Sequence, residues 1–374
     1  MKNIVLLFLS FVFCLQIVKS QDIYDSIYVD GRWRTYLTHL PQSYNPAINY
    51  PLVLAFHGGG PLGYQSIQFQ SRLSQKSDSA GFIVIYPEGV KVAGNRTWNA
   101  GGCCAPATNL NIDDVGFVDV LLDSIFAERA IDTLRVYATG FSNGALLSYR
   151  LANQLAHRFA AIAPVAGNLM YYPWAPSSVV PIISFHSYLD LNVPCFGGVT
   201  VGTTGTYFPP QDSALGIISS DYSCLNIKDT ISHNPGQYDH FRYSNCSCNA
   251  LIEQYVSYDG EHSWPGGLAS TGINVSNQFS ATYLMWEFFQ NYSLGCLSTG
   301  TENSYQENSL QVYPNPFSRK LYSNCQFCEE FKLYDSQGRL IWSGKNIENA
   351  DFSDLQRGLY FLKAEKQIQK LIKL

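Results

Sequence analysis

The chain has 374 residues, of which 46% are hydrophobic and 14% are charged, and its formal net charge is −5. This length suits one large domain and a small one, and so small a charged fraction argues against a disordered or coiled-coil protein. No basic stripe appears along the chain, which argues against a nucleic-acid partner.

The first element is a targeting segment over residues 1–20. Lys2 precedes a long apolar run, and the small residue Ser20 ends it. This pattern is typical of a secretory signal peptide and is too short for a stable membrane anchor. A lipoprotein signal ending at Cys14 is the weaker interpretation, because bulky Phe13 stands where a small residue is expected. With no later stretch able to span a bilayer, we expect a secreted protein, either extracellular or at the cell surface.

Short apolar runs alternate with helical patterns throughout residues 21–295. An antiparallel hairpin is predicted first, over 24–41, and the near-continuous apolar runs that follow are typical of a parallel sheet covered on both faces. The predicted strands cover 51–58, 81–89, 133–140, 159–167, 181–187 and 251–260. The predicted helices cover 113–128, 143–158 and 276–293, with Asp113 or Asp114 and Ser276 as N-caps. This alternation predicts a three-layer α/β sandwich with a mostly parallel sheet.

The chain ends in two further segments. Residues 296–309 are polar and aperiodic, which predicts a linker. Residues 310–374 consist of short β-rich runs separated by turn signals, which predicts a small all-β sandwich of the immunoglobulin-like kind. An accessory β-sandwich that binds carbohydrate is the alternative interpretation of this tail.

The chain has ten cysteines, and all but one follow the targeting segment. In an exported chain, these later cysteines favour disulfides over metal ligands. Without Cys14 their number is odd, so at least one thiol is left unpaired. Cys325 and Cys328 have CxxC spacing, but no second pair completes a zinc site. Spacing does not fix the connectivity, and Cys224 with Cys246 or Cys248 is the pairing that we favour. We predict neither a metal nor a cofactor.

The segment GFSNG, residues 140–144, lies where a predicted strand meets a predicted helix. A GxSxG segment at such a junction bends sharply, and its glycines let the serine project from the edge of the sheet. The alternative is a structural turn without chemistry. We predict Ser142 as a nucleophile, and such a serine needs a base and an acid that orients the base.

His262 and Asp190 are the predicted partners of this serine. His262 follows the last predicted strand directly, in a glycine-rich loop, and Asp190 follows the strand before it. Serine, acid and histidine each on a loop after a strand, in that chain order, are typical of one class of serine hydrolase. Asp259 is the rival acid, but it would not lie on a separate strand end.

Two further groups of residues are predicted around the serine. In the segment FHGGG, the backbone N–H of Gly59 would hold an oxyanion together with the N–H of Asn143. His57 belongs to this loop, and we expect it to orient the loop rather than act as the base. Trp98 and Trp264 are candidate substrate-binding residues that could stack on a sugar or a phenolic ring, with core packing as the alternative.

Six segments of residues 24–295 resemble, in the same order, the recurring segments of the secreted polyhydroxybutyrate depolymerase/feruloyl esterase group of α/β-hydrolases. They are VDGRWRTYLTHLP, PLVLAFHGGG, TWNAGGCC, DDVGFV, GFSNGA and GEHSWPGG. The resemblance implies an α/β-hydrolase fold and the same serine, aspartate and histidine as catalytic triad. Two departures affect substrate preference. Cys195 stands where an aromatic residue is more usual, and the insertion 197–250 is long and bears cysteines.

The tail resembles the C-terminal sorting domain of type IX secretion. VYPNPF (312–317), LYDSQGRLI (333–341) and GLYFLKAEKQIQKLIKL (358–374) match its pattern, including the basic end. The resemblance implies a partner, the type IX secretion machinery. It also implies export across the outer membrane of a Gram-negative bacterium, often with removal of the tail.

The combined prediction is an exported serine esterase that cleaves carboxylic esters through an acyl-enzyme. The expected substrate is polymeric and consists of feruloyl or acetyl esters of plant polysaccharide, or of polyhydroxybutyrate-type polyesters. Two alternatives remain open. The first is a serine peptidase of the same fold, and the second is a non-catalytic surface protein that binds polysaccharide.

Overall fold

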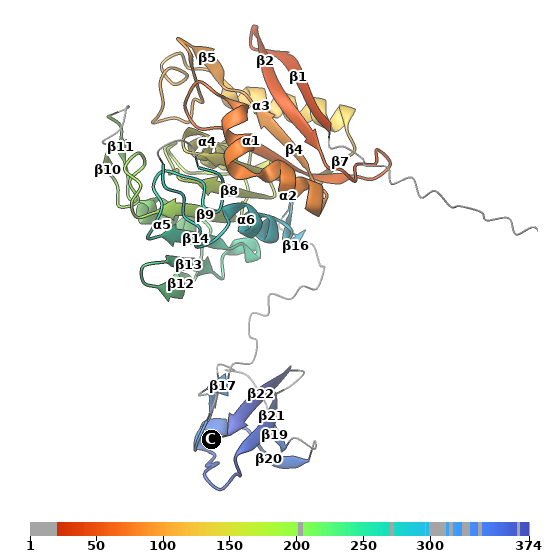
Figure 1. The fold of residues 1–374 in the computed structure, drawn as a ribbon, viewed down its shortest axis with the longest axis vertical. Coiled ribbons are helices and arrows are strands. Elements are labelled where there is room, and N and C mark those ends of the chain that lie inside the picture. The colour runs from red at the N-terminus through yellow and green to blue at the C-terminus, as the bar shows by residue number, and fades with distance from the viewer. Residues whose placement is uncertain are drawn as a thin grey trace, which may run out of the picture. The chain divides into compact units, whose positions relative to one another are not determined.

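The computed structural model of the chain describes residues 21–200, 205–269, 273–295, 297–298, 312–313, 317–323, 330–335, 339–364 and 367–373. The predicted signal peptide and nearly all of the predicted linker therefore lie outside the described residues. The chain divides into two compact units, Met1–Thr299 and Gly300–Leu374 (Figure 1). Each unit has hydrophobic clusters of its own.

The larger unit is built on a sheet that has ten strands among the described residues, in the order β1-β2-β4-β3-β7-β8-β9-β14-β13-β12. These strands are β1 (Gln21–Val29), β2 (Arg32–Leu40), β3 (Tyr50–Phe56), β4 (Ile83–Pro87), β7 (Ile131–Phe141), β8 (Ala161–Val165), β9 (Ile182–Ser187), β12 (Asn226–Asn234), β13 (Tyr238–Ser244) and β14 (Ile252–Ser257). Neighbours from β4 to β14 run parallel, whereas β1–β2 and β12–β13 are antiparallel pairs at the two margins. The predicted central parallel sheet and the predicted first hairpin are both confirmed.

Helices pack on both faces of this sheet (Figure 1). They are α1 (Tyr64–Ser71), α2 (Leu73–Ala80), α3 (Asp114–Glu128), α4 (Asn143–Gln154), α5 (Gln211–Asp221) and α6 (Ala281–Phe289). Apolar residues of α3, α4 and α5 join one buried cluster, and those of α1, α2 and α6 join another. The three-layer α/β architecture is therefore confirmed.

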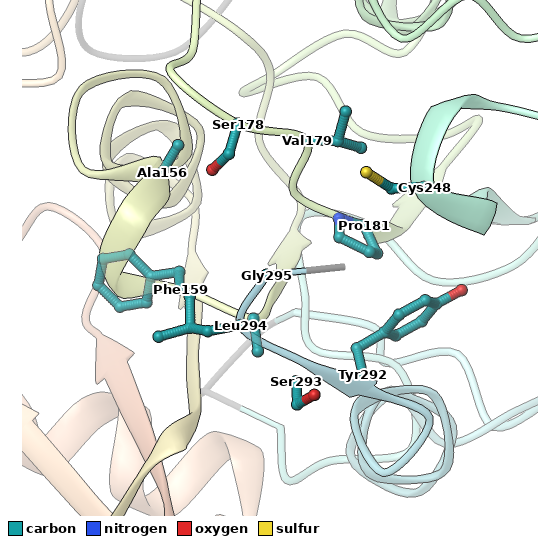
Figure 2. Close-up of a pocket in the computed structure, with 11 residues that line it drawn as sticks. Ala156, Phe159, Ser178, Val179, Pro181, Cys248, Tyr292, Ser293, Leu294 and Gly295 are labelled. Atoms are coloured by element: carbon teal, nitrogen blue, oxygen red, sulfur yellow. The ribbon is translucent and has the colours of Figure 1, made fainter. Parts of the chain in front are cut away.

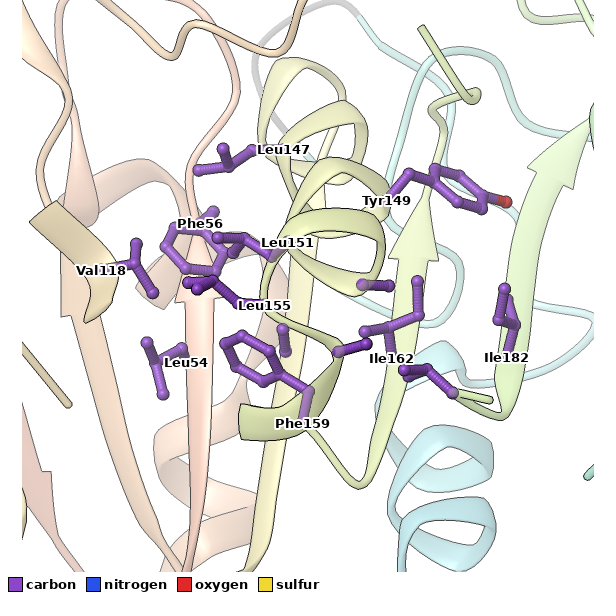
Figure 3. Close-up of a cluster of buried hydrophobic side chains, with 14 of the residues drawn as sticks. Leu54, Phe56, Val118, Leu147, Tyr149, Leu151, Leu155, Phe159, Ile162 and Ile182 are labelled. Atoms are coloured by element: carbon purple, nitrogen blue, oxygen red, sulfur yellow. The ribbon is translucent and has the colours of Figure 1, made fainter. Parts of the chain in front are cut away.

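Strand β3 shows why a two-sided sheet gives continuous apolar runs. Leu52, Leu54 and Phe56 belong to the cluster on the α4 side, and Figure 3 shows the last two beside the side chains of that helix. Val53 and Ala55 belong to the cluster on the other face. Successive side chains of a strand point to opposite faces, so both sets must be apolar when both faces are covered.

The two predicted helix starts have different outcomes. The N-cap of α3 is Asp113, one of the two predicted candidates. The N-cap of α6 is Ser280, so the prediction of Ser276 is wrong. Ser276 donates its hydroxyl hydrogen to Asp259. That contact joins two loops, and helix periodicity carries no sign of it.

Short elements complete the larger unit. The two-stranded pairs are β5 (Val90–Val92) with β6 (Asn95–Thr97), β10 (Gly198–Val199) with β11 (Tyr207–Phe208), and β15 (Tyr292–Ser293) with β16 (Leu297–Ser298). The 3-10 helices are η1 (Ala156–Arg158) and η2 (Ser247–Asn249). Within the described ranges, no helix is both long enough and apolar enough to cross a bilayer.

The smaller unit is all-β apart from one short 3-10 helix in its described residues. An antiparallel sheet has the order β20-β19-β21-β22, and β17 pairs with β18. The elements are β17 (Val312–Tyr313), β18 (Tyr322–Ser323), β19 (Phe331–Asp335), β20 (Leu340–Gly344), η3 (Ile347–Asn349), β21 (Gly358–Ala364) and β22 (Gln367–Lys373). Its core gathers Phe317, Leu333 and Leu362. The all-β prediction is confirmed, and the immunoglobulin-like form stays a prediction.

Candidate active site

Ser142 sits at a sharp turn between β7 and α4. Its φ of 55° and ψ of −119° lie outside the regions that most residues adopt, at a cost of roughly 1–3 kcal/mol. Its N–H donates to the Val165 carbonyl at 2.9 Å, which holds the turn against β8. A Cβ on Gly140 would overlap the carbonyl group of Gly144, and one on Gly144 would overlap that of Phe56. The glycines are required because strand, turn and helix approach too closely for a side chain.

The side chains of Ser142, His262 and Asp190 form a continuous hydrogen-bonded chain. His262 Nε2 is 2.8 Å from Ser142 Oγ, and His262 Nδ1 is 2.7 Å from Asp190 Oδ2. The three residues follow β7, β14 and β9, whose carboxyl ends lie at the same edge of the sheet. Asp259, the rival acid, accepts a hydrogen bond from Ser276 instead. The structure thus brings the three predicted residues together and leaves Asp259 in a separate loop contact.

Asp190 is buried and ionised. Burial by itself would raise its pKa, but the charge and hydrogen bond of His262, the nearby His186 and the Val193 N–H hold the pKa of Asp190 below its ordinary value. Its other oxygen, Oδ1, accepts from Asn192 N–H at 2.9 Å and from Val193 N–H at 2.8 Å. An ionised carboxylate at this place keeps the proton of His262 on Nδ1 and stabilises the imidazolium. Nε2 is then able to take a proton from a hydroxyl.

Asn143 connects the turn at Ser142 to the loop that follows β6. Its Oδ1 accepts from Trp98 N–H at 2.6 Å, and its Nδ2 donates to the Trp98 carbonyl at 3.0 Å. The backbone N–H of Asn143 lies in the first turn of α4, where N–H groups have no partner inside the helix. Negative charge is favoured at this end of a helix. The N–H is therefore suited to a developing oxyanion beside Ser142.

His57 holds the loop of the FHGGG segment, residues 56–60, in place; this segment is called the glycine loop below. Its Nε2 accepts from Gly89 N–H at 2.9 Å, so the proton is on Nδ1, which donates to the Gly58 carbonyl at 2.6 Å. Burial lowers the pKa of His57 to about 4, so the ring is neutral at pH 7. The Gly58 carbonyl and the Gly59 N–H belong to one planar peptide unit, so fixing the first also directs the second.

A cavity of about 560 Å³ opens beside Ser142 and His262. Its wall combines the glycine loop and the turn at Ser142 with segments that are distant in sequence. The other lining residues are Gly58, Gly59, Gly60, Asn95, Thr97, Cys103, Cys104, Ala105, Phe141, Asn143, Leu146, Asn192, Val193, Thr200, Phe208 and Ile273. Apart from His262, none of these described lining residues carries an ionisable side chain. The cavity is suited to an uncharged ligand.

Trp98 and Trp264 are not among the described residues that line this cavity, so their prediction as substrate-binding residues is wrong. Both side chains are fully buried. The indole N–H of Trp98 donates to the His57 carbonyl at 2.9 Å, and that of Trp264 donates to Thr282 Oγ1 at 2.9 Å. Core packing, the alternative interpretation, holds for both, because ring and N–H are satisfied inside the protein.

Three cysteine features differ in how far the sequence revealed them. Cys224 forms a disulfide with Cys246, one of the two pairings favoured from the sequence. Cys103 and Cys104 form a second disulfide between adjacent residues. The sequence did not lead us to place this pair at the cavity. Two adjacent cysteines that directly follow two glycines were the feature that could have indicated it. Cys195 has a free, buried thiol, and burial raises the pKa of Cys195 to about 12, which keeps it protonated.

A second cavity, of about 20 Å³, lies where η1 approaches β15. Figure 2 shows its wall, which includes Phe159, Pro181 and Tyr292. A volume of this size holds about one water molecule. It contains none of the predicted site residues. Among the described residues, no group of three or more histidine, cysteine or carboxylate side chains is placed to hold a metal ion.

Comparison with known proteins relates these features to two families. Residues 35–184 match the family model described as esterase PHB depolymerase. This segment therefore resembles the esterases of that family. Residues 311–374 match the secretion system C-terminal sorting domain. Such a tail indicates a secreted or cell-surface protein, which confirms the predicted localisation.

Several named proteins are similar in sequence to part of this chain. The bifunctional acetylxylan esterase/xylanase XynS20E of Neocallimastix patriciarum is 33% identical over 153 residues, covering 41% of this chain and 21% of that protein. The putative esterase NocK of Nocardia uniformis subsp. tsuyamanensis is 32% identical over 187 residues, covering 48% and 52%. Feruloyl esterase C of Emericella nidulans is 27% identical over 263 residues, covering 68% and 83%. The chain thus spans about a fifth and about half of the first two relatives.

Solved structures also resemble part of this chain. The acetyl xylan esterase from Aspergillus awamori has a TM-score of 0.46 and 14% sequence identity, and the match covers 71% of this chain and 99% of that chain. Similarity at this level does not inform the function.

Proposed function

We propose that this protein is an exported serine hydrolase that cleaves carboxylic esters. The observation that carries the proposal is the hydrogen-bonded chain from Ser142 through His262 to Asp190. It stands at a cavity whose described lining has no other ionisable side chain, which suits a neutral ester. The match of residues 35–184 to an esterase family supports the same chemistry.

The reaction begins when His262 Nε2 takes the hydroxyl proton of Ser142 while Oγ attacks the ester carbonyl carbon. The N–H groups of Gly59 and Asn143 hold the negative charge that develops on the carbonyl oxygen. The carbon–oxygen bond to the alcohol then breaks, and the alcohol leaves with the proton carried by His262. Water, deprotonated by His262, attacks the acyl-enzyme, and the acid departs as Ser142 regains its proton. Asp190 stays ionised throughout.

The decisive experiment compares the wild type with Ser142→Ala on a chromogenic acyl ester and with a fluorophosphonate probe. We expect kcat to fall by about 10⁴-fold or more, and labelling to disappear with it. Ser79→Ala, which changes an exposed serine of α2, is the matched control and should retain both. Equal ester hydrolysis by Ser142→Ala and the wild type would reject the proposal.

The substrate class is part of the same proposal. Candidates are feruloyl or acetyl esters of plant polysaccharide and polyhydroxybutyrate-type polyesters, because relatives are named as acetylxylan and feruloyl esterases and the matching family as PHB depolymerase. Comparison of kcat/KM for methyl ferulate, acetylated xylan and hydroxybutyrate oligomers would rank them. Casein digestion without ester hydrolysis would instead favour a serine peptidase. Polysaccharide retention without fluorophosphonate labelling would favour a non-catalytic binding protein.

We also propose a function for each segment of the chain. Residues 21–295 form the esterase domain, residues 296–309 a linker, and residues 310–374 an immunoglobulin-like sorting domain that the type IX secretion machinery recognises. The match of residues 311–374 to a secretion sorting domain supports the last assignment. Deleting residues 310–374 and finding the protein still exported would contradict it.

A further inference from the structure

Cys103 and Cys104 line the same cavity as Ser142 and His262, and the hydrolytic steps above do not use them. The two residues are adjacent and joined by a disulfide. Cys103 is buried against the core on the α4 side of the sheet, and Cys104 is partly exposed. Both residues therefore belong to the wall of the cavity in which a bound ester would lie.

Two glycines bring the pair to this place. The N–H of Gly102 donates to the Met170 carbonyl at 2.8 Å. A Cβ on Gly101 would lie 2.8 Å from the Met170 carbonyl oxygen, and one on Gly102 would lie 2.9 Å from Met170 Cε. The chain passes this neighbour too closely for side chains. The position of Cys103 is consequently fixed by a contact with the loop after β8, independently of the disulfide.

The backbone of the pair is held from both sides. The Cys103 carbonyl accepts from Ala100 N–H at 3.3 Å, and the Cys104 carbonyl accepts from Thr108 N–H at 3.4 Å. The Thr108 hydroxyl donates to the same carbonyl at 3.3 Å. The Ala107 N–H donates to Thr97 Oγ1, which links this segment to another lining residue. These contacts hold the backbone of the pair in place at the wall of the cavity.

A disulfide gives a wall of particular chemistry. It has no charge and no hydrogen-bond donor, and its sulfurs are polarizable, a property that favours contact with aromatic rings. Ala105, Leu146 and Phe208 continue this apolar surface around the cavity. The polar part of the lining includes Ser142 and His262, and the reacting carbonyl of an ester would lie beside them. The remaining apolar part is where the non-reacting end of the ester can be placed.

A purely structural tie accounts poorly for this disulfide. Cross-links stabilise a fold chiefly by removing loop entropy from the unfolded chain, and the gain grows with the length of the closed loop. The bond between Cys103 and Cys104 has a sequence separation of 1, so it closes almost no loop. The bond between Cys224 and Cys246, with a separation of 22, can act in this way.

We propose that the Cys103–Cys104 disulfide is a specificity-determining wall that contacts the apolar acyl group of the ester and favours planar aromatic acyl groups over acetyl. The inference rests on the proposed ester hydrolysis and deepens it. Its failure is distinguishable, because ester hydrolysis can persist while the preference for aromatic acyl groups is absent or does not depend on the disulfide.

The first experiment measures kcat/KM for methyl ferulate and for an aryl acetate with purified full-length protein. For the double variant Cys103→Ala/Cys104→Ala, we expect the ferulate-to-acetate ratio of kcat/KM to fall at least fivefold below that of the wild type. Cys224→Ala/Cys246→Ala is the matched control, because it removes a disulfide whose cysteines are not among the described residues that line the cavity. It should leave the ratio unchanged even where it lowers thermal stability.

A second experiment uses protein in which both disulfides are still present. Ser142→Ala protein is treated with a water-soluble phosphine, which reduces a disulfide to two thiols and becomes a phosphine oxide whose oxygen comes from water. The new thiols are alkylated and counted by mass spectrometry. Saturating methyl ferulate should slow the reduction of Cys103–Cys104 at least fivefold, without slowing that of Cys224–Cys246. Methyl acetate should protect neither bond.

Three results would overturn the inference. The wild type could hydrolyse acetate esters while showing no preference for ferulate. The ratio could be unchanged in Cys103→Ala/Cys104→Ala, or could fall equally in Cys224→Ala/Cys246→Ala. Reduction of Cys103–Cys104 could proceed at the same rate with and without methyl ferulate. In each case ester hydrolysis that is abolished in Ser142→Ala would leave the proposed function standing.

Discussion

Two buried ionisable residues near the cavity reach opposite charge states through the groups around them. His57 meets one backbone donor and one backbone acceptor, and burial lowers the pKa of His57 to about 4, so it is neutral. Asp190 meets two backbone donors and an imidazole, which hold its pKa below the ordinary value, so it is charged. In the proposed reaction the neutral ring positions a peptide group, and the charged carboxylate supports a proton transfer. Surroundings, rather than residue type, assign these roles.

The positioning role of His57 predicts a loss that appears in kcat. In His57→Ala the Gly58 carbonyl loses its donor, so the Gly59 N–H is no longer directed and kcat should fall by roughly 10²-fold, with KM little changed. His57→Asn offers an amide donor near the position of Nδ1 and should recover part of the activity. Steady-state kinetics on a chromogenic ester tests both variants. An unchanged kcat in His57→Ala would contradict the role.

The pKa of His57 also predicts how stability depends on pH. Its folded-state pKa of about 4 lies below the ordinary value of 6.5, so the unfolded chain binds more protons between these values. The stabilisation is complete above pH 6.5 and is lost as the pH falls towards 4. From pH 7 to 4.5 the wild type should lose about 2 kcal/mol more free energy of unfolding than His57→Asn.

Urea denaturation of the two proteins at both pH values measures this difference. Asp190 does not interfere, because its folded-state pKa lies below its ordinary value and its contribution is lost only at lower pH. Parallel loss of stability in both proteins would show that other groups dominate the acid response.

The turn at Ser142 constrains the packing of β7, α4 and β3. Strand β7 leads into it, α4 leaves it, and the first turn of α4 passes directly over the end of β3. Gly144 is at the point of closest approach, where a Cβ would overlap the carbonyls of Phe56 and His57. The sheet, the helix and the glycine loop therefore share one packing arrangement around Ser142.

Two glycine substitutions separate this constraint from helix propensity. Gly144→Ala should lower the free energy of unfolding by about 2 kcal/mol or more, because neither backbone can withdraw without displacing α4. Gly216→Ala in α5 meets nothing within 4 Å and should raise stability by about 0.5–1 kcal/mol. Denaturant melts of the two variants provide the comparison. Destabilisation of equal size in both would show that close packing at Gly144 is unimportant.

The sequence predicted elements well where local pattern determines them. Continuous apolar runs gave the parallel strands, and chain order around GFSNG pointed to Asp190 and His262, which the structure brings beside Ser142. Local pattern failed where a distant partner decides. Trp98 and Trp264 resemble exposed loop aromatics in sequence, yet backbone and hydroxyl acceptors from other segments hold them inside. The start of α6 was misplaced because a partner elsewhere uses Ser276.

At the scale of the whole molecule, the two compact units have separate cores. The larger unit buries two clusters against the two faces of its sheet, and the smaller one buries a cluster around Phe317 and Leu333. Every residue of the hydrogen-bonded chain and of the cavity belongs to the larger unit. The proposed ester hydrolysis and the proposed sorting role would thus be carried by different cores.

Separate cores predict separate unfolding. A chain ending at Thr299 should keep kcat/KM for a soluble ester within about twofold of the full-length value, because no described site residue is removed. Calorimetry of the full-length protein should show a transition that the shortened chain lacks. Loss of activity together with loss of the larger unit's melting transition would contradict independent folding.

The near absence of charge in the cavity has a consequence for turnover. An ester arrives neutral, but the acid released from it is an anion at pH 7. In the proposed reaction the described lining offers this anion no lysine or arginine. The released acid should therefore inhibit hydrolysis only weakly, so that a polymer could be cleaved repeatedly while free acid accumulates around the enzyme.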